Sequence, residues 1–123
     1  MAAMTMRALN ISKGTVLAER LREARTPWSR LVGLLNRNHL PEGEGLLIVP
    51  CSSVHTFFMR FPIDVAFLDR KGRVLKVFIS VPPFRLLLGG PGARMALELP
   101  SGTLISTSTE PGDQLLFENQ DPQ

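Results

Sequence analysis

The 123-residue sequence contains only one cysteine, Cys51, so no disulfide can form within the chain. It also lacks an apolar run of the roughly 20 residues that a membrane-spanning helix requires. The apolar core of a signal peptide is missing as well, because Arg7 interrupts the first ten residues. These absences favour a cytoplasmic protein with no part in a membrane.

The composition is that of an ordinary globular protein, with 44% hydrophobic and 20% charged residues. A chain of this length predicts one compact β-rich domain, over residues 1–118, and a frayed tail at 119–123. The net charge of +3 is unevenly spread. Residues 1–40 carry seven basic side chains and two acidic ones, whereas residues 98–123 carry five acidic side chains and no basic one. We expect these ends to attract one another, which reduces the free basic surface and disfavours nucleic-acid binding.

Short apolar runs separated by turn signals predict about seven strands. Between two of them, Asp69-Arg70-Lys71-Gly72 predicts a β-hairpin with glycine at a position of positive φ. The pattern at 15–25 is ambiguous between helix and strand, and 81–92 reads as an irregular loop. The expected strands are 5–11, 46–49, 54–61, 63–68, 74–79, 93–99 and 114–118.

One helix is predicted over residues 27–36. Thr26 is a favourable N-cap, and Pro27 suits the first helical position because its missing N–H needs no partner there. Together the elements predict a mainly β (α+β) fold, a small closed or partly open antiparallel or mixed β-barrel with this one helix. The apolar stripe that supports the helix consists of Trp28, Leu31, Val32, Leu34 and Leu35.

The middle of the chain resembles a family of small prokaryotic domains, the domain of unknown function number 192. The resemblance rests mainly on Cys51-x-x-Val54-His55-Thr56-Phe57-Phe58-Met59-Arg60-Phe61-Pro62-Ile63-Asp64-Val65-x-Phe67-Leu68-Asp69. It extends over roughly 16–117 through Gly33-Leu34-Leu35, Leu97-Glu98-Leu99 and Pro111-Gly112-Asp113. It implies a mainly β, barrel-like fold with a short helix, and no particular reaction. Many relatives follow a leader peptide, and the expected lack of one here argues against an envelope role.

The same stretch holds the densest group of polar and reactive side chains. We interpret the chain as a non-catalytic or accessory domain that binds a small ligand or a partner protein, as a monomer or weak dimer without a cofactor. The expected cleft lies between residues 51–60, Asp64, the 84–92 loop and Glu98. The candidate ligand-binding residues are His55, Thr56, Phe58, Met59, Arg60, Asp64 and Glu98.

The main alternative is a hydrolase- or transferase-type enzyme. Cys51 would act as a thiolate and His55 as its base, with Asp64 or Glu98 orienting the imidazole. In a fully extended chain these two residues stand about 13 Å apart, so the pair requires a bend at residues 50–53.

A copper site and a surface for single-stranded nucleic acid are further alternatives. Cys51-x3-His55-x3-Met59 has the order of a type-1 copper loop, and His39 is the only other histidine that can complete it. Arginine interleaved with phenylalanine in the same stretch suits stacked bases.

Asp64 also has a structural interpretation. Buried in an apolar strand, it would pair with Arg60 or with backbone N–H groups and hold the bend between residues 55 and 64. Glu98, flanked by Leu97 and Leu99, allows the same two interpretations.

Overall fold

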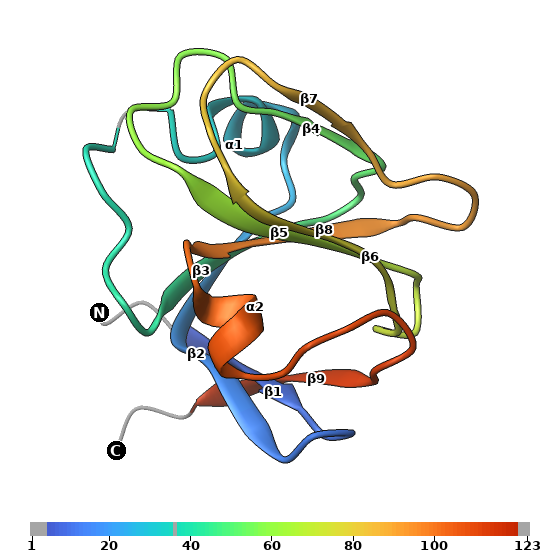
Figure 1. Ribbon diagram of the computed structural model, residues 1–123. Coiled ribbons are helices and arrows are strands. Elements are labelled where there is room, and N and C mark those ends of the chain that lie inside the picture. The colour runs from blue at the N-terminus through green and yellow to red at the C-terminus, as the bar shows by residue number, and fades with distance from the viewer. Residues whose placement is uncertain (1–4, 36, 121–123) are drawn as a thin grey trace.

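The computed structural model describes residues 5–35 and 37–120. Neither helix in the described part of the chain has the length and hydropathy that crossing a bilayer takes. Figure 1 shows the elements, which in chain order are β1 (Thr5–Asn10), β2 (Thr15–Ala24), α1 (Pro27–Val32), β3 (Glu44–Ile48), β4 (Ser53–His55), β5 (Ile63–Leu68), β6 (Val74–Val81), β7 (Leu86–Leu88), β8 (Met95–Pro100), α2 (Thr103–Ser106) and β9 (Leu115–Gln120).

Seven strands form one curled sheet in the order β6-β5-β8-β3-β2-β1-β9, and β4 and β7 form a separate two-stranded ribbon. All neighbours are antiparallel except β2 and β3. The edge strands β6 and β9 approach each other only near their first residues, where Arg73 and Gln114 form an isolated bridge. The mainly β fold with a short helix near residue 27 is therefore confirmed, and the sheet is not closed.

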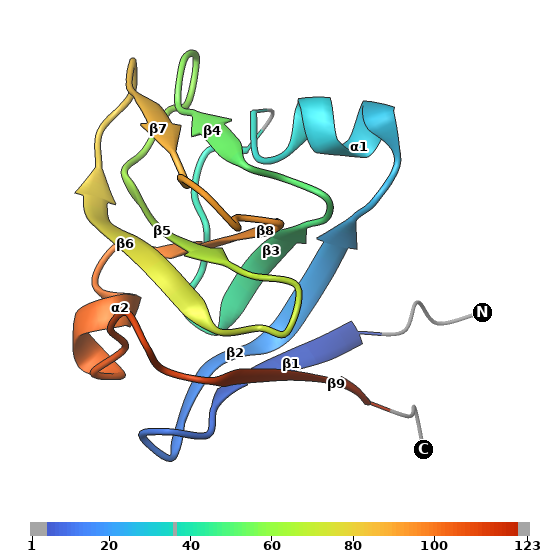
Figure 2. The same ribbon diagram turned by 90° about the vertical axis from the view of Figure 1, so that its right-hand side faces the viewer.

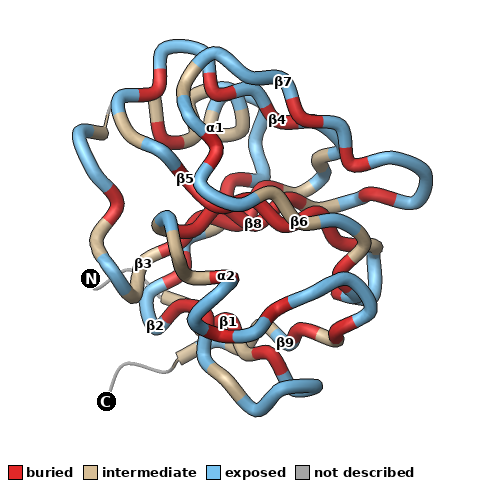
Figure 3. Tube along the Cα trace, viewed as in Figure 1, coloured by how far each residue is buried: buried red, intermediate tan, exposed pale blue. Residues whose placement is uncertain are grey.

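The sheet separates two apolar cores, because successive side chains of a strand point to opposite faces. Along β5, Val65 and Phe67 belong to one core, and Ala66 and Leu68 belong to the other. Figure 2 shows that α1 and the β4–β7 ribbon lie on one side of β5 and β8, with β1, β9 and α2 on the other. Buried residues follow the middle strands in Figure 3, so the centre of the sheet contributes to both cores.

The first helix begins as predicted and ends earlier. Ser29 N donates to Thr26 Oγ1 at 3.0 Å, which confirms the N-cap. The helix stops at Val32 because Gly33, whose N–H still makes the last helical bond to Ser29 O, adopts a φ of 49°. Asn36, the last residue of the predicted helix, lies outside the described residues.

The ambiguous stretch at 15–25 is a strand, since β2 pairs with β1 on one side and with β3 on the other. The loop at 81–92 contains the short strand β7, and α2 follows β8 without having been predicted.

The expected strand over 54–61 is wrong, because β4 ends at His55. Thr56 turns the chain there: its hydroxyl donates to Pro82 O at 2.7 Å and accepts from Arg85 N at 2.9 Å. Met59 N then donates to Thr56 O, and Phe58 adopts a φ of 67°. The side chains from His55 to Met59 therefore do not alternate between two faces of a strand.

The two ends of the chain attract one another as predicted. Arg7 on β1 pairs with Glu118 on β9, and Lys13 bonds Asp113 at 2.8 Å. Of the predicted 119–123 tail, Asn119 and Gln120 belong to β9 and pair with β1, and residues 121–123 lie outside the described residues.

Asp64 is a fully buried carboxylate that fastens β5 to its surroundings. Its Oδ1 accepts from Ser80 N at 2.8 Å, and its Oδ2 accepts from Gly102 N at 3.1 Å and Leu104 N at 2.9 Å. Of the two kinds of partner expected for Asp64, backbone N–H groups are the ones observed, and Arg60 is not one, since it bonds Asn38 Oδ1 instead.

Replacing Asp64 tests this role. We expect D64A to lower the free energy of unfolding by about 3–5 kcal/mol, because it leaves the buried Leu104 N–H and the partly buried N–H groups of Ser80 and Gly102 without their acceptor. The matched control is D69A. Asp69 also accepts two backbone N–H bonds, from Lys71 and Arg73, but in the exposed hairpin turn, where water replaces them at a cost of about 1 kcal/mol. Equal losses in chemical denaturation would contradict the assigned role.

Candidate functional site

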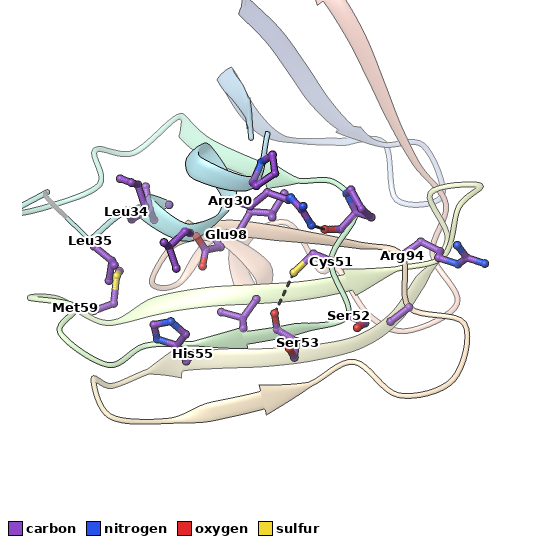
Figure 4. A pocket seen from close by; sticks show the side chains of 18 residues that line it. Arg30, Leu34, Leu35, Cys51, Ser52, Ser53, His55, Met59, Arg94 and Glu98 are labelled. Atoms are coloured by element: carbon purple, nitrogen blue, oxygen red, sulfur yellow. Dashed lines mark hydrogen bonds between the residues drawn. The ribbon is translucent and has the colours of Figure 1, made fainter. Parts of the chain in front are cut away.

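A cavity of about 760 Å³ lies beneath α1 and the loop that follows this helix (Figure 4). Residues 50–55 and β8 form its other sides. This volume is in the range of small-molecule sites in proteins. Its walls are formed by Pro27, residues 30–35, Ile48, residues 50–55, Met59, Ala93, Arg94 and Glu98.

Among the described residues, Glu98 is the only acidic one that lines this cavity. It points to the same face of β8 as Ala96, and its register partners on the two neighbouring strands are Leu46 and Val65. The side chain is 4% exposed, and its carboxyl has no hydrogen bond or ion pair with any described residue. Burial among apolar neighbours raises the pKa of Glu98 to about 7.

Arg30, in the last turn of α1, brings a positive charge to the same cavity. Its Nη1 donates to Pro50 O at 3.1 Å, and its enclosed Nε has no hydrogen-bond partner within the described residues. Among the described residues, Arg30 and Glu98 do not form an ion pair with each other. Opposite charges therefore line one cavity without neutralising each other directly.

Cys51 and His55 both line the cavity, but they occupy different surroundings. The half-buried Cys51 thiol donates to Ser53 O at 3.1 Å, and burial is the main reason that its pKa is raised. The exposed His55 ring stacks on Phe57, with 5.5 Å between the ring centroids. No hydrogen bond joins Cys51 to His55 among the described residues, so the geometry shows no thiolate–imidazole pair.

The other predicted ligand-binding residues are dispersed. Met59 is buried and lines the cavity, whereas Thr56 holds the turn described above. Phe58 is 76% exposed, and Arg60 reaches out to Asn38. Asp64 lies on the opposite face of the sheet, bound to backbone N–H groups. The cavity thus brings together His55, Met59, Glu98 and Cys51.

Sequence reasoning missed the contribution of α1 and of Arg94. The signal was present in part, since the predicted apolar stripe included Leu34 and Leu35, which line the cavity. The position of Arg30 depends on how the helix lies on the sheet, which periodicity does not specify.

The donor set does not resemble a metal centre. Within residues 5–35 and 37–120, no group of three histidine, cysteine or acidic side chains is arranged to hold an ion. His39, which the copper interpretation needs, is exposed and does not line the cavity with Cys51, His55 and Met59.

Solved structures share this fold. A protein of unknown function from Novosphingobium aromaticivorans superposes with a TM-score of 0.79 at 21% identity, covering 94% of this chain and 93% of that one. A Sinorhizobium meliloti protein, described as a proposed transcription regulator, gives 0.80 at 22% identity, covering 94% of each chain. At these identities the likeness concerns the fold alone.

Sequence comparisons identify the family. Residues 8–117 match the model of DUF192, described as "Uncharacterized ACR, COG1430". A UPF0127 protein of Pyrococcus furiosus is 31% identical over 112 residues, covering 87% of this chain and 94% of the relative. One from Thermococcus sibiricus is 32% identical over 118 residues, covering 89% and 73%. The chain belongs to the DUF192 family, which confirms the resemblance.

The buried carboxyl makes stability depend on pH. Because the pKa of Glu98 is about 7 in the folded protein, above its ordinary value of 4.5, the unfolded chain loses this proton first as pH rises. The free energy of unfolding is therefore highest below about pH 4.5 and declines as the pH rises to about 7. We expect E98Q to be more stable than the wild type by about 3 kcal/mol at about pH 8, and nearly equal to it at about pH 4.

Denaturation at several pH values measures this difference, and E19Q, at an exposed carboxyl, is the control. A constant difference between E98Q and wild type across the whole range would show that Glu98 ionises normally.

The Cys51 thiol gives a separate prediction. Because burial raises its pKa, we expect iodoacetamide to alkylate it with a pH midpoint above the value of about 8.5 for a free cysteine. H55A should leave this midpoint unchanged, since His55 makes no hydrogen bond to the thiol. A midpoint near neutrality that H55A abolishes would instead support the enzyme alternative.

Proposed function

We propose that this protein is a binding domain for a small, largely apolar molecule that carries a cationic or hydrogen-bond-donating group. The observation that carries the proposal is Glu98, a buried carboxyl that has no partner in the described protein and lines a cavity of about 760 Å³. A buried acceptor without a partner is costly, so a ligand that donates to it gains affinity.

The rest of the cavity suits the apolar part of such a ligand. Leu34, Ile48, Val54 and Met59 are buried side chains that line it. Leu31 is 62% exposed and also lines the cavity, so its position fits an opening toward solvent. Apolar walls with a few convergent polar groups are the usual composition of a small-molecule site.

The enzyme alternative has less support. A nucleophilic cysteine needs a lowered pKa and a base within hydrogen-bond reach, whereas the pKa of Cys51 is raised and its thiol bonds the Ser53 carbonyl. Binding needs neither feature.

Isoamylamine, a branched apolar chain with one ammonium group, is the first probe. We expect a titration at about pH 8, followed by amide shifts in ¹⁵N-labelled protein, to move resonances of the cavity residues with a millimolar Kd. E98Q should weaken this binding about tenfold, because the amide cannot offset the ammonium charge. R94Q, which alters an exposed arginine at the same cavity, should have little effect.

Two results would contradict the proposal. One is an absence of shifts around Glu98 with saturating isoamylamine. The other is equal affinity of wild type and E98Q, which would place the ammonium elsewhere.

A further inference from the structure

The charges at the cavity point to a narrower class of ligand. Glu98 and Arg30 line it from opposite layers, Glu98 from β8 in the sheet and Arg30 from α1 above it (Figure 4). The carboxyl of Glu98 and the Nε of Arg30 both have no hydrogen-bond partner among the described residues. Buried polar groups of native proteins are almost always satisfied, so the enclosed Nε of Arg30, at the same cavity as a carboxyl without a partner in the described residues, calls for an explanation.

The way Arg30 is held leaves a particular edge of its guanidinium unused. Nη1 is occupied by Pro50 O, whereas Nε and Nη2 make no hydrogen bond with the described residues. Two neighbouring N–H groups of a guanidinium form the fork that binds both oxygens of a carboxylate in parallel. Arg30 lines the cavity and is only partly buried, and because its Nε is enclosed, binding through this edge requires the side chain to rotate.

The segments around the cavity contain no other acid that would repel a carboxylate. Residues 25–41, 49–63 and 82–97 include no aspartate or glutamate, and they contribute Arg30 and Arg94 to the lining. Among the described lining residues, negative charge is therefore confined to Glu98 on the sheet. The partly buried Arg30 of α1 carries the positive charge opposite it, whereas the exposed Arg94 side chain extends away from the cavity (Figure 4). The cavity has two poles.

We propose that the ligand is a small zwitterion, a molecule with an ammonium and a carboxylate group such as a free amino acid. Its ammonium binds Glu98, its carboxylate binds the free edge of Arg30, and its side chain occupies the apolar part of the cavity. This inference rests on the proposed function and adds the carboxylate. A zwitterion neutralises both protein charges at once, which offsets the cost of removing them from water.

Three probes with the same branched carbon skeleton measure the contributions of the ammonium and the carboxylate to binding separately. Leucine carries both charges, isoamylamine carries the ammonium alone, and 4-methylpentanoate carries the carboxylate alone. We expect leucine to bind at least about tenfold more tightly than either single-charge probe in ¹⁵N amide-shift titrations. Glycine and phenylalanine, tested alongside, show whether the side chain matters.

Variants assign the carboxylate to its residue. R30Q should reduce leucine affinity to that of isoamylamine while leaving isoamylamine affinity unchanged. R30K, which keeps the charge without the fork, should lie between wild type and R30Q. R94Q is the matched control and should keep leucine affinity within about twofold of wild type. Thermal unfolding of each variant verifies that it is folded.

The outcomes distinguish this inference from the proposed function. If leucine and isoamylamine bind equally, and R30Q changes neither, the zwitterion is wrong and an amine-binding site remains. If R94Q removes the advantage of leucine and R30Q does not, the assignment to Arg30 is wrong. If the amine and all three amino acids fail to shift cavity resonances at about 10 mM, both proposals fall.

Discussion

The proposed function depends most on the position of the Glu98 carboxyl in an inner strand of an apolar sheet. Its neighbours across β3 and β5 are Leu46 and Val65, and in the described protein nothing donates to it. An isolated buried charge costs several kcal/mol, which is why its pKa shifts to about 7 instead of staying acidic. A packed core at this place would use an apolar side chain. The proposed function therefore treats the cavity and the carboxyl together, as one binding site.

Asp64 shows the contrasting solution on the adjacent strand. Asp64 pairs in register with Leu99, and Val65 pairs with Glu98, so the two carboxyls are close along the sheet but point to opposite faces. Asp64 receives three backbone N–H bonds and serves stability. Glu98 receives none. On one face of the sheet the chain itself satisfies the buried carboxyl, whereas on the face under α1 Glu98 has no donor among the described residues, which is the basis of the proposed site.

Much of the fold was predictable, because strands and turns depend on local patterns. The hairpin at 69–72 and the N-cap at Thr26 follow from side-chain chemistry that acts over a few residues. The turn at Thr56 was not predictable, since it depends on bonds to Pro82 and Arg85, about 30 residues away. The site was predictable in part for the same reason: Glu98 was identifiable as an acid in an apolar strand, but the place of Arg30 at the same cavity depends on helix placement.

The ionisation of Glu98 itself is the most direct test of this account. Carbon-13 NMR of the glutamate side-chain carboxyls, followed against pH, measures its pKa without unfolding the protein. The account predicts a value of about 7 in the free protein, and a lower value once isoamylamine or leucine occupies the cavity, because a bound ammonium stabilises the carboxylate. A Glu98 pKa near 4.5 that neither probe changes would contradict it.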